Sequence, residues 1–154
     1  MNKDKTSFVY VTYIRSTPEK VFEALTQPAV ARRYWGHENV SDWKPGSDWQ
    51  HVRADEGRAV QVLGKVVEVA PPTRLVITWA SPSGAADPAS YSRVSFDIAP
   101  YDGMVRLTVT HDELETGSAM ATGVQKGWPI VLSSLKSLLE TGQGIDVFAK
   151  PKAA

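Results

Sequence analysis

Residues 127–142 read GWPIVLSSLKSLLETG, and this stretch decides the fold. Its apolar side chains recur at intervals of three or four residues, which is the spacing of one face of an amphipathic helix. Gly142 suits the left-handed conformation that commonly ends a helix, and Pro129 suits a first turn because proline has no N–H to lose. We therefore predict a long helix over residues 127–141, with some further helix between residues 118 and 125. Its apolar stripe consists of Trp128, Val131, Leu132, Leu135, Leu138 and Leu139.

Most of the chain before this helix has the alternation of an antiparallel sheet. Residues 91–99 and 104–111 carry apolar side chains at every second position, and the Asp102-Gly103 pair between them is a strong hairpin signal. Such alternation leaves one face of the sheet polar and one apolar, so helices must cover a single face. Gly64 interrupts the phase of the longest remaining strand, which predicts a bulge there. Further strands are expected over residues 8–14, 40–43, 49–53, 59–69 and 74–79.

Two short helices are predicted directly after the first strand. Thr17 can cap a helix, Pro18 suits its first position, and Glu19 favours the positive end of the helix dipole. Pro28 should end this helix, because the residue before a proline avoids the α region. A second short helix is expected over residues 29–34. The elements together predict an α+β fold, with a curved antiparallel sheet around one long helix.

Composition places the chain among ordinary globular proteins. Its 154 residues fit a single domain, with a core over about 8–142 and a loose tail over 143–154. The 17 basic and 17 acidic residues cancel, which argues against nucleic acid as a partner. The absence of cysteine excludes disulfides and thiolate metal sites. No apolar run approaches the roughly 18 residues of a membrane helix or the core of a signal peptide, so a cytoplasmic protein without a membrane partner is expected.

Several short motifs resemble a known superfamily in their order along the chain. They are YIRSTPEKVFEALT at 13–26, RYW at 33–35, WKPG at 43–46, PPTRLVITW at 71–79, TVTH at 108–111 and GWP at 127–129. This order resembles the START-like (SRPBCC) superfamily, and within it the branch named for the activator of Hsp90 ATPase homologue 1. The resemblance implies the helix-grip fold, also called START/Bet v 1-like, with a hydrophobic cavity between the sheet and the last helix. Many relatives bind lipids, sterols, polyketides or other apolar molecules there.

Large side chains are the candidates for lining such a cavity. A tryptophan offers a flat apolar ring with one N–H, which suits an apolar ligand, but tryptophans also fill the cores of curved sheets. Trp43 is assigned to the core. The residues expected to line the cavity are Trp35, Trp49, Trp79, Phe96, His111, Trp128, Leu132 and Leu135.

His111 has two interpretations. By strand parity it shares the buried face of its strand, where an imidazole can orient a ligand or transfer a proton. The alternative, which we favour, is a hydrogen-bonded histidine of the core. His37 and His51 complete the histidines, and no spacing typical of a zinc site links the three. We predict no metal, no cofactor and no assigned catalytic residue.

Three functions from different classes follow. The leading one is a binder of a small hydrophobic molecule in the cavity. The second is an enzyme on apolar, ring-bearing substrates, like the polyketide cyclases and aromatases of the superfamily, with His111 or Tyr13 transferring the proton. The third is a protein-interaction module related to the Hsp90 activators, although the eukaryotic activator has an additional N-terminal domain and the chaperone role transfers poorly. Either a monomer or a homodimer fits the sequence.

Overall fold

The computed structural model describes residues 4–55 and 57–145. Most of the predicted tail at 143–154 therefore lies outside the described residues. Seven strands form one antiparallel sheet in the order β1-β7-β6-β5-β4-β3-β2. The strands are β1 Lys5–Ile14, β2 His37–Ser41, β3 Asp48–Arg53, β4 Val60–Ala70, β5 Arg74–Trp79, β6 Ser92–Tyr101 and β7 Met104–Glu115. The predicted helix-grip fold is confirmed.

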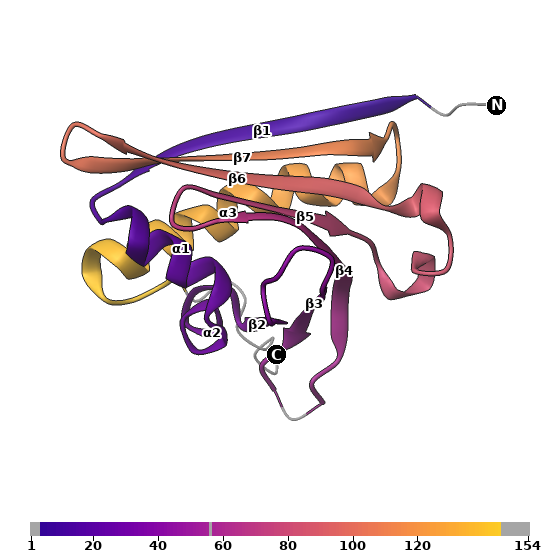
Figure 1. The fold of residues 1–154 in the computed structure, drawn as a ribbon, viewed down its shortest axis with the longest axis horizontal. Coiled ribbons are helices and arrows are strands. Elements are labelled where there is room, and N and C mark those ends of the chain that lie inside the picture. The colour runs from indigo at the N-terminus through magenta and orange to yellow at the C-terminus, as the bar shows by residue number, and fades with distance from the viewer. Residues whose placement is uncertain (1–3, 56, 146–154) are drawn as a thin grey trace, which may run out of the picture.

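The helices follow the predicted order. Helix α1 (Pro18–Thr26) and helix α2 (Pro28–Trp35) come directly after β1, and Thr17 caps α1 by accepting a hydrogen bond from the Lys20 backbone N–H. The long helix α3 spans Ala119–Thr141 and runs along the part of the sheet that β1, β6 and β7 form (Figure 1). Two short 3-10 turns, Pro82–Gly84 and Pro88–Ser90, lie between β5 and β6. None of the described helices is long and apolar enough to cross a membrane.

The start of α3 differs from the prediction. One helix begins at Ala119 and continues through Pro129, which lies in its interior instead of its first turn. Ser118 starts the helix, because its hydroxyl accepts a hydrogen bond from the Ala121 backbone N–H at 3.1 Å. Pro129 removes one hydrogen bond to the carbonyl of Gln125. Because Gln125 is exposed, water can take that place.

The predicted bulge at Gly64 is wrong. The register shifts of β4 fall between Val66 and Glu68 and opposite His51 and Val52, whereas Gly64 pairs regularly with Trp49. The glycine is needed for close packing instead. A Cβ built at position 64 would lie 2.1 Å from the carbonyl oxygen of Thr78, a contact that no side chain can make.

The C-terminal half of α3 is fixed to the rest of the fold. Three of its four leucines, Leu132, Leu135 and Leu138, are buried in the same cluster as Val94, Phe96 and Leu107 of the sheet. This half of the helix therefore packs directly into the core.

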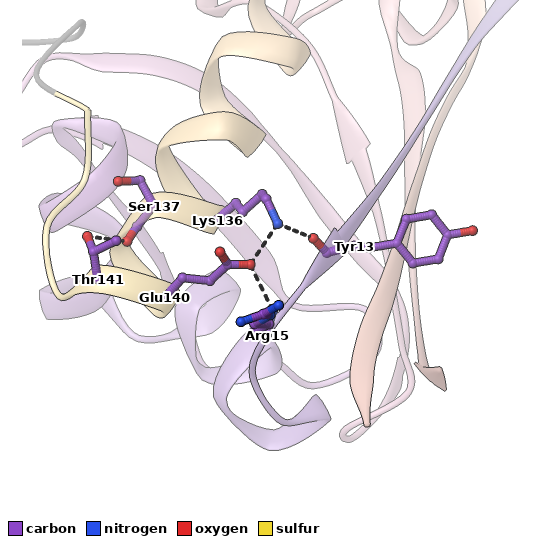
Figure 2. Close-up of polar contacts among 6 residues, drawn as sticks. All are labelled: Tyr13, Arg15, Lys136, Ser137, Glu140 and Thr141. Carbon is purple, nitrogen blue, oxygen red and sulfur yellow. Dashed lines mark hydrogen bonds and ion pairs between the residues drawn. The ribbon is translucent and has the colours of Figure 1, made fainter. Parts of the chain in front are cut away.

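A polar clamp adds to this anchoring (Figure 2). Glu140 accepts hydrogen bonds from the Arg15 backbone N–H at 2.9 Å and from the Lys136 ammonium at 2.6 Å. Lys136 also donates to the Tyr13 carbonyl at 2.6 Å. Two residues before Lys136, the Ser134 hydroxyl donates to the Tyr34 carbonyl at 2.7 Å and so joins α3 to α2. The hollow described next lies beside the other half of the helix.

Candidate ligand-binding pocket

A pocket of about 520 Å³ lies between the N-terminal half of α3 and strands β3 to β5. This volume is within the range of small-molecule sites. Ala119 and Gly123 line it and are exposed, so the pocket opens to solvent on their side. A second hollow of about 620 Å³ lies beside Trp49 and Tyr91, and its lining includes Lys65 and Asp48, which pair with each other at 2.6 Å. The first pocket is the candidate site, because apolar side chains form most of its wall.

Small residues on one face of α3 create the space. Ala119, Gly123 and Gly127 are spaced four residues apart, and all three line the pocket. Apart from the adjoining residues and the nearby backbone of the helix itself, no heavy atom lies within 4 Å of a Cβ built at Gly123 or Gly127. Glycine inside a helix costs roughly 0.5–1 kcal/mol relative to alanine. The helix carries two such glycines on the face that borders the pocket.

Three tryptophans form an aromatic part of the pocket wall. The ring centroids of Trp35 and Trp79 are 6.5 Å apart, and those of Trp128 lie 5.6 and 5.5 Å from them. The three side chains come from the end of α2, the end of β5 and the middle of α3. All three are buried and all line the pocket. They offer a ligand a continuous aromatic surface.

His111 orients this wall without facing the pocket. The Trp128 indole N–H donates to His111 Nδ1 at 3.0 Å, so the proton of the neutral ring must be on Nε2. Nε2–H then donates to the Ser92 hydroxyl at 2.7 Å, and that hydroxyl donates to the Trp79 carbonyl at 3.0 Å. The ring is fully buried and uses both nitrogens, as a core histidine does. Burial lowers the pKa of His111 to about 4.

Two other histidines border the pocket, although sequence reasoning gave them no role. His37 and His51 stack with ring centroids 4.4 Å apart and planes 8° apart. His51 Nδ1 lies 2.7 Å from Asn39 Oδ1, and the Asn39 amide donates to the Leu25 carbonyl at 2.9 Å. Burial lowers the pKa of His51 well below its ordinary value, and the charge of His37 is a smaller cause.

The strand boundaries explain why this pair was missed. The predicted strand over residues 40–43 begins three residues too late, because β2 starts at His37. Only the observed register places Asn39 directly opposite His51. One signal was present in the sequence: His51 is two residues after Trp49 in a strand, so the two side chains share a face.

The predicted cavity residues separate into two groups. Trp35, Trp79 and Trp128 line the pocket, whereas the other five do not. Trp49 donates its indole N–H to the Thr78 carbonyl at 2.7 Å inside the core. Phe96 packs edge-on against Trp128 with centroids 5.8 Å apart. His111, Leu132 and Leu135 are fully or almost fully buried behind that wall.

The remaining polar candidates lie away from the pocket. Tyr13 is 39% exposed and contacts Tyr101 on the surface, with ring centroids 5.0 Å apart. Among the described residues, no group of three or more histidine, aspartate or glutamate side chains is placed to hold a metal ion. The arrangement offers apolar walls and a few polar atoms, which is the chemistry of a binding site.

Comparison with known proteins places the chain in a family. Its fold is similar to the solution structure of the Aha1 dimer from Colwellia psychrerythraea, with a TM-score of 0.75 and 20% identity over 90% of this chain and 99% of that one. The crystal structure of CalU16 from Micromonospora echinospora is similar with a TM-score of 0.67 and 23% identity, over 88% of this chain and 77% of that one. The crystal structure of PFC0360w, an HSP90 activator from Plasmodium falciparum, is similar with a TM-score of 0.65 and 20% identity, over 79% of this chain and 86% of that one.

Identities this low establish the fold alone. Curated proteins give no match to the sequence. The family model described as "Activator of Hsp90 ATPase homolog 1-like protein" matches residues 15–140, which is most of the chain. The chain therefore belongs to the family of Activator of Hsp90 ATPase homolog 1-like proteins.

Proposed function

We propose that this protein binds a small hydrophobic molecule in the pocket between the N-terminal half of α3 and the tryptophan wall. The observation that supports this most is the glycine face of the helix. Gly123 and Gly127 line the same pocket as Trp35 and Trp79, and each would have room for a side chain. A helix selected for stability alone would carry alanine or a larger residue at both positions.

The walls favour a flat molecule. Aromatic rings pack in offset or edge-to-face arrangements at centroid distances of roughly 4.5–7 Å, and such pairs add stability beyond the area they bury. Trp35, Trp79 and Trp128 are already in this arrangement with one another. A planar ring that enters beside Gly123 and Gly127 would extend the same stack.

The binding experiment uses the indole N–H signals in a ¹H–¹⁵N correlation spectrum, titrated with 2-naphthol. Trp35 and Trp79 line the pocket, and their signals should shift most. Trp43 and Trp49 donate their indole N–H groups to backbone carbonyls and do not line this pocket, so their signals should stay nearly unchanged. Equal shifts at all five tryptophans, or none, would contradict the proposal.

A pair of leucine variants provides the matched control. Gly123→Leu places a leucine in the pocket, whereas Gln125→Leu places one at an exposed position of α3 that does not line it. The first variant should weaken 2-naphthol binding at least tenfold, and the second should leave it unchanged. If both variants weaken binding alike, the added apolar side chain and not its place in the pocket is the cause; if neither does, the ligand does not bind beside Gly123.

The other functions stay predictions. A chaperone or a second copy of the chain as partner is suggested by relatives described as an Aha1 dimer and an HSP90 activator, and at 20% identity they support only the fold. An enzymatic role through His111 or Tyr13 has less support, because neither side chain lines the pocket. Size-exclusion chromatography and titration with Hsp90 test the partner predictions.

A further inference from the structure

The indole N–H groups of the tryptophans differ in whether they have a hydrogen-bond acceptor. Of the five tryptophans, three donate their indole N–H inside the protein: Trp43 to the Thr26 carbonyl at 2.9 Å, Trp49 to the Thr78 carbonyl at 2.7 Å and Trp128 to His111 at 3.0 Å. Within the described residues, the indole N–H groups of Trp35 and Trp79 have no acceptor. These two side chains line the pocket.

Both unpaired donors have access to open space. In the described part of the chain, Ser16 Oγ is the only side-chain nitrogen or oxygen that is shut off from solvent and also lacks a hydrogen-bond partner. The indole N–H groups of Trp35 and Trp79 are therefore not shut off, although their residues are only 7% and 8% exposed. Both rings border the pocket and also a small internal space of about 10 Å³ beside Leu75 and Phe96. Only the pocket is large enough for a ligand, so we place both donors on its surface.

His51 supplies an acceptor beside these donors. Asn39 donates its amide N–H to the Leu25 carbonyl, which fixes its carbonyl oxygen toward His51. An amide oxygen only accepts, so His51 Nδ1 carries the proton and Nε2 carries a lone pair. Nε2 has no partner among the described residues and, like the two indoles, is not shut off from solvent. His51 therefore presents a hydrogen-bond acceptor to the pocket that it lines.

The rings that carry the two donors and the acceptor lie close to one another. The ring centroids of Trp35 and His51 are 4.3 Å apart, and those of His51 and Trp79 are 6.2 Å apart. A hydroxyl matches this combination, because its O–H donates to His51 Nε2 while its lone pairs accept from the indoles. A carboxylate would be repelled there, because its negative charge would lie against the lone pair of His51. An ammonium group has only donors, so it could not accept a hydrogen bond from the two indole N–H groups.

We propose that the pocket selects a neutral, ring-bearing molecule with a hydroxyl group, and that His51, Trp35 and Trp79 recognise the hydroxyl. This inference rests on the proposed binding function and adds the chemical class of the ligand. The hydroxyl lies at the polar end of the pocket, and the ring lies against the glycine face of α3. A ligand without the hydroxyl leaves these three polar atoms buried and unpaired, which costs affinity.

Three naphthalenes of similar shape test the selection at pH 7. Of these, 2-naphthol can donate and accept, 2-methylnaphthalene can do neither, and 2-naphthoate is an anion. Their dissociation constants are measured by titration of the indole N–H signals. We expect 2-naphthol to bind about tenfold more tightly than either of the others, since each polar atom left unpaired weakens binding.

Two variants each remove one of the proposed partners of the hydroxyl and keep a ring. His51→Phe removes the acceptor and Trp79→Phe removes one donor, and each should reduce the preference for 2-naphthol to about threefold or less. Trp43→Phe is the matched control, because the Trp43 indole bonds to the Thr26 carbonyl and does not line the pocket. It should keep the full preference. If His51→Phe fails to fold, Trp79→Phe still tests the inference.

The outcomes separate the two proposals. If all three naphthalenes bind with equal affinity, or 2-naphthoate binds most tightly, hydroxyl selection is wrong and the binding function stands. If 2-naphthol is preferred but His51→Phe and Trp79→Phe keep that preference, these residues do not recognise the hydroxyl. If none of the three shifts the Trp35 and Trp79 signals, the binding function itself fails.

Discussion

Acid should destabilise this protein through His111. The side chain has no solvent exposure, and burial lowers its pKa from 6.5 to about 4. In the unfolded chain the imidazole takes up a proton near pH 6.5, whereas in the folded protein it stays neutral to about pH 4. The unfolded state therefore binds more protons between these values, and stability falls as the pH falls through that window.

The magnitude follows from the two pKa values. One pKa unit corresponds to about 1.36 kcal/mol, so the full shift removes about 3 kcal/mol below pH 4. Between pH 7.5 and pH 5 the loss is about 2 kcal/mol, because the folded ring is still almost fully neutral there. The cause of the lowered pKa is burial, and the hydrogen bond from the Trp128 indole to His111 Nδ1 matches the neutral form of the ring. A proton on Nδ1 would point at the indole N–H and break this hydrogen bond.

Urea unfolding followed by tryptophan fluorescence measures this effect. His51 and the carboxylates also titrate, so the comparison is with His111→Gln, which keeps a donor for Ser92 and does not titrate. This variant should be less stable at pH 7.5, because the Trp128 indole loses its acceptor. Its stability should then fall by about 2 kcal/mol less than that of the wild type between pH 7.5 and pH 5. Parallel pH dependences in the two proteins would refute the account of His111.

Three substitutions test other parts of the structure. Gly127→Ala should raise the free energy of unfolding by roughly 0.5–1 kcal/mol, measured by urea unfolding, because no heavy atom within 4 Å opposes the added methyl group; a loss of stability would contradict the open space there. Gly64→Ala should cost about 2–4 kcal/mol, because its Cβ would lie 2.1 Å from the Thr78 carbonyl oxygen; a thermal midpoint equal to that of the wild type would show that the strands do not approach so closely. Trp128→Phe should raise the pKa of His111, followed by its imidazole NMR signals, since Nδ1 no longer faces an N–H donor; an unchanged titration would mean that the indole does not hold the ring neutral.

Local sequence signals predicted the order of the elements. The alternation around Asp102-Gly103 gave the β6–β7 hairpin, and Thr17 with Pro18 gave the start of α1. The prediction divided α3 into a helix from residue 127 and some helix between residues 118 and 125, because Gly123, Gly127 and Pro129 all count against one continuous helix. Packing and the Ser118 cap outweigh these residues, as the continuous helix from Ala119 shows.

The location of the pocket depended on contacts that no local pattern contains. The leucine stripe of α3 was the strongest periodic signal, and strong apolar periodicity marks the half of a helix that the core covers. The space lies beside the weaker half, where glycines replace the stripe. The acceptor of His51 depends on a cross-strand pair with Asn39, which only the strand register supplies.

The central claim is that a small ring molecule occupies the space between the glycine face of α3 and the tryptophan wall. Intermolecular nuclear Overhauser effects from bound 2-naphthol test it most directly. We expect contacts to the indole protons of Trp35 and Trp79 and to the Hα protons of Gly123 and Gly127. Contacts confined to the exposed apolar side chains of β1, Val9 at 54% and Val11 at 45% exposure, would place binding on the sheet surface and contradict it.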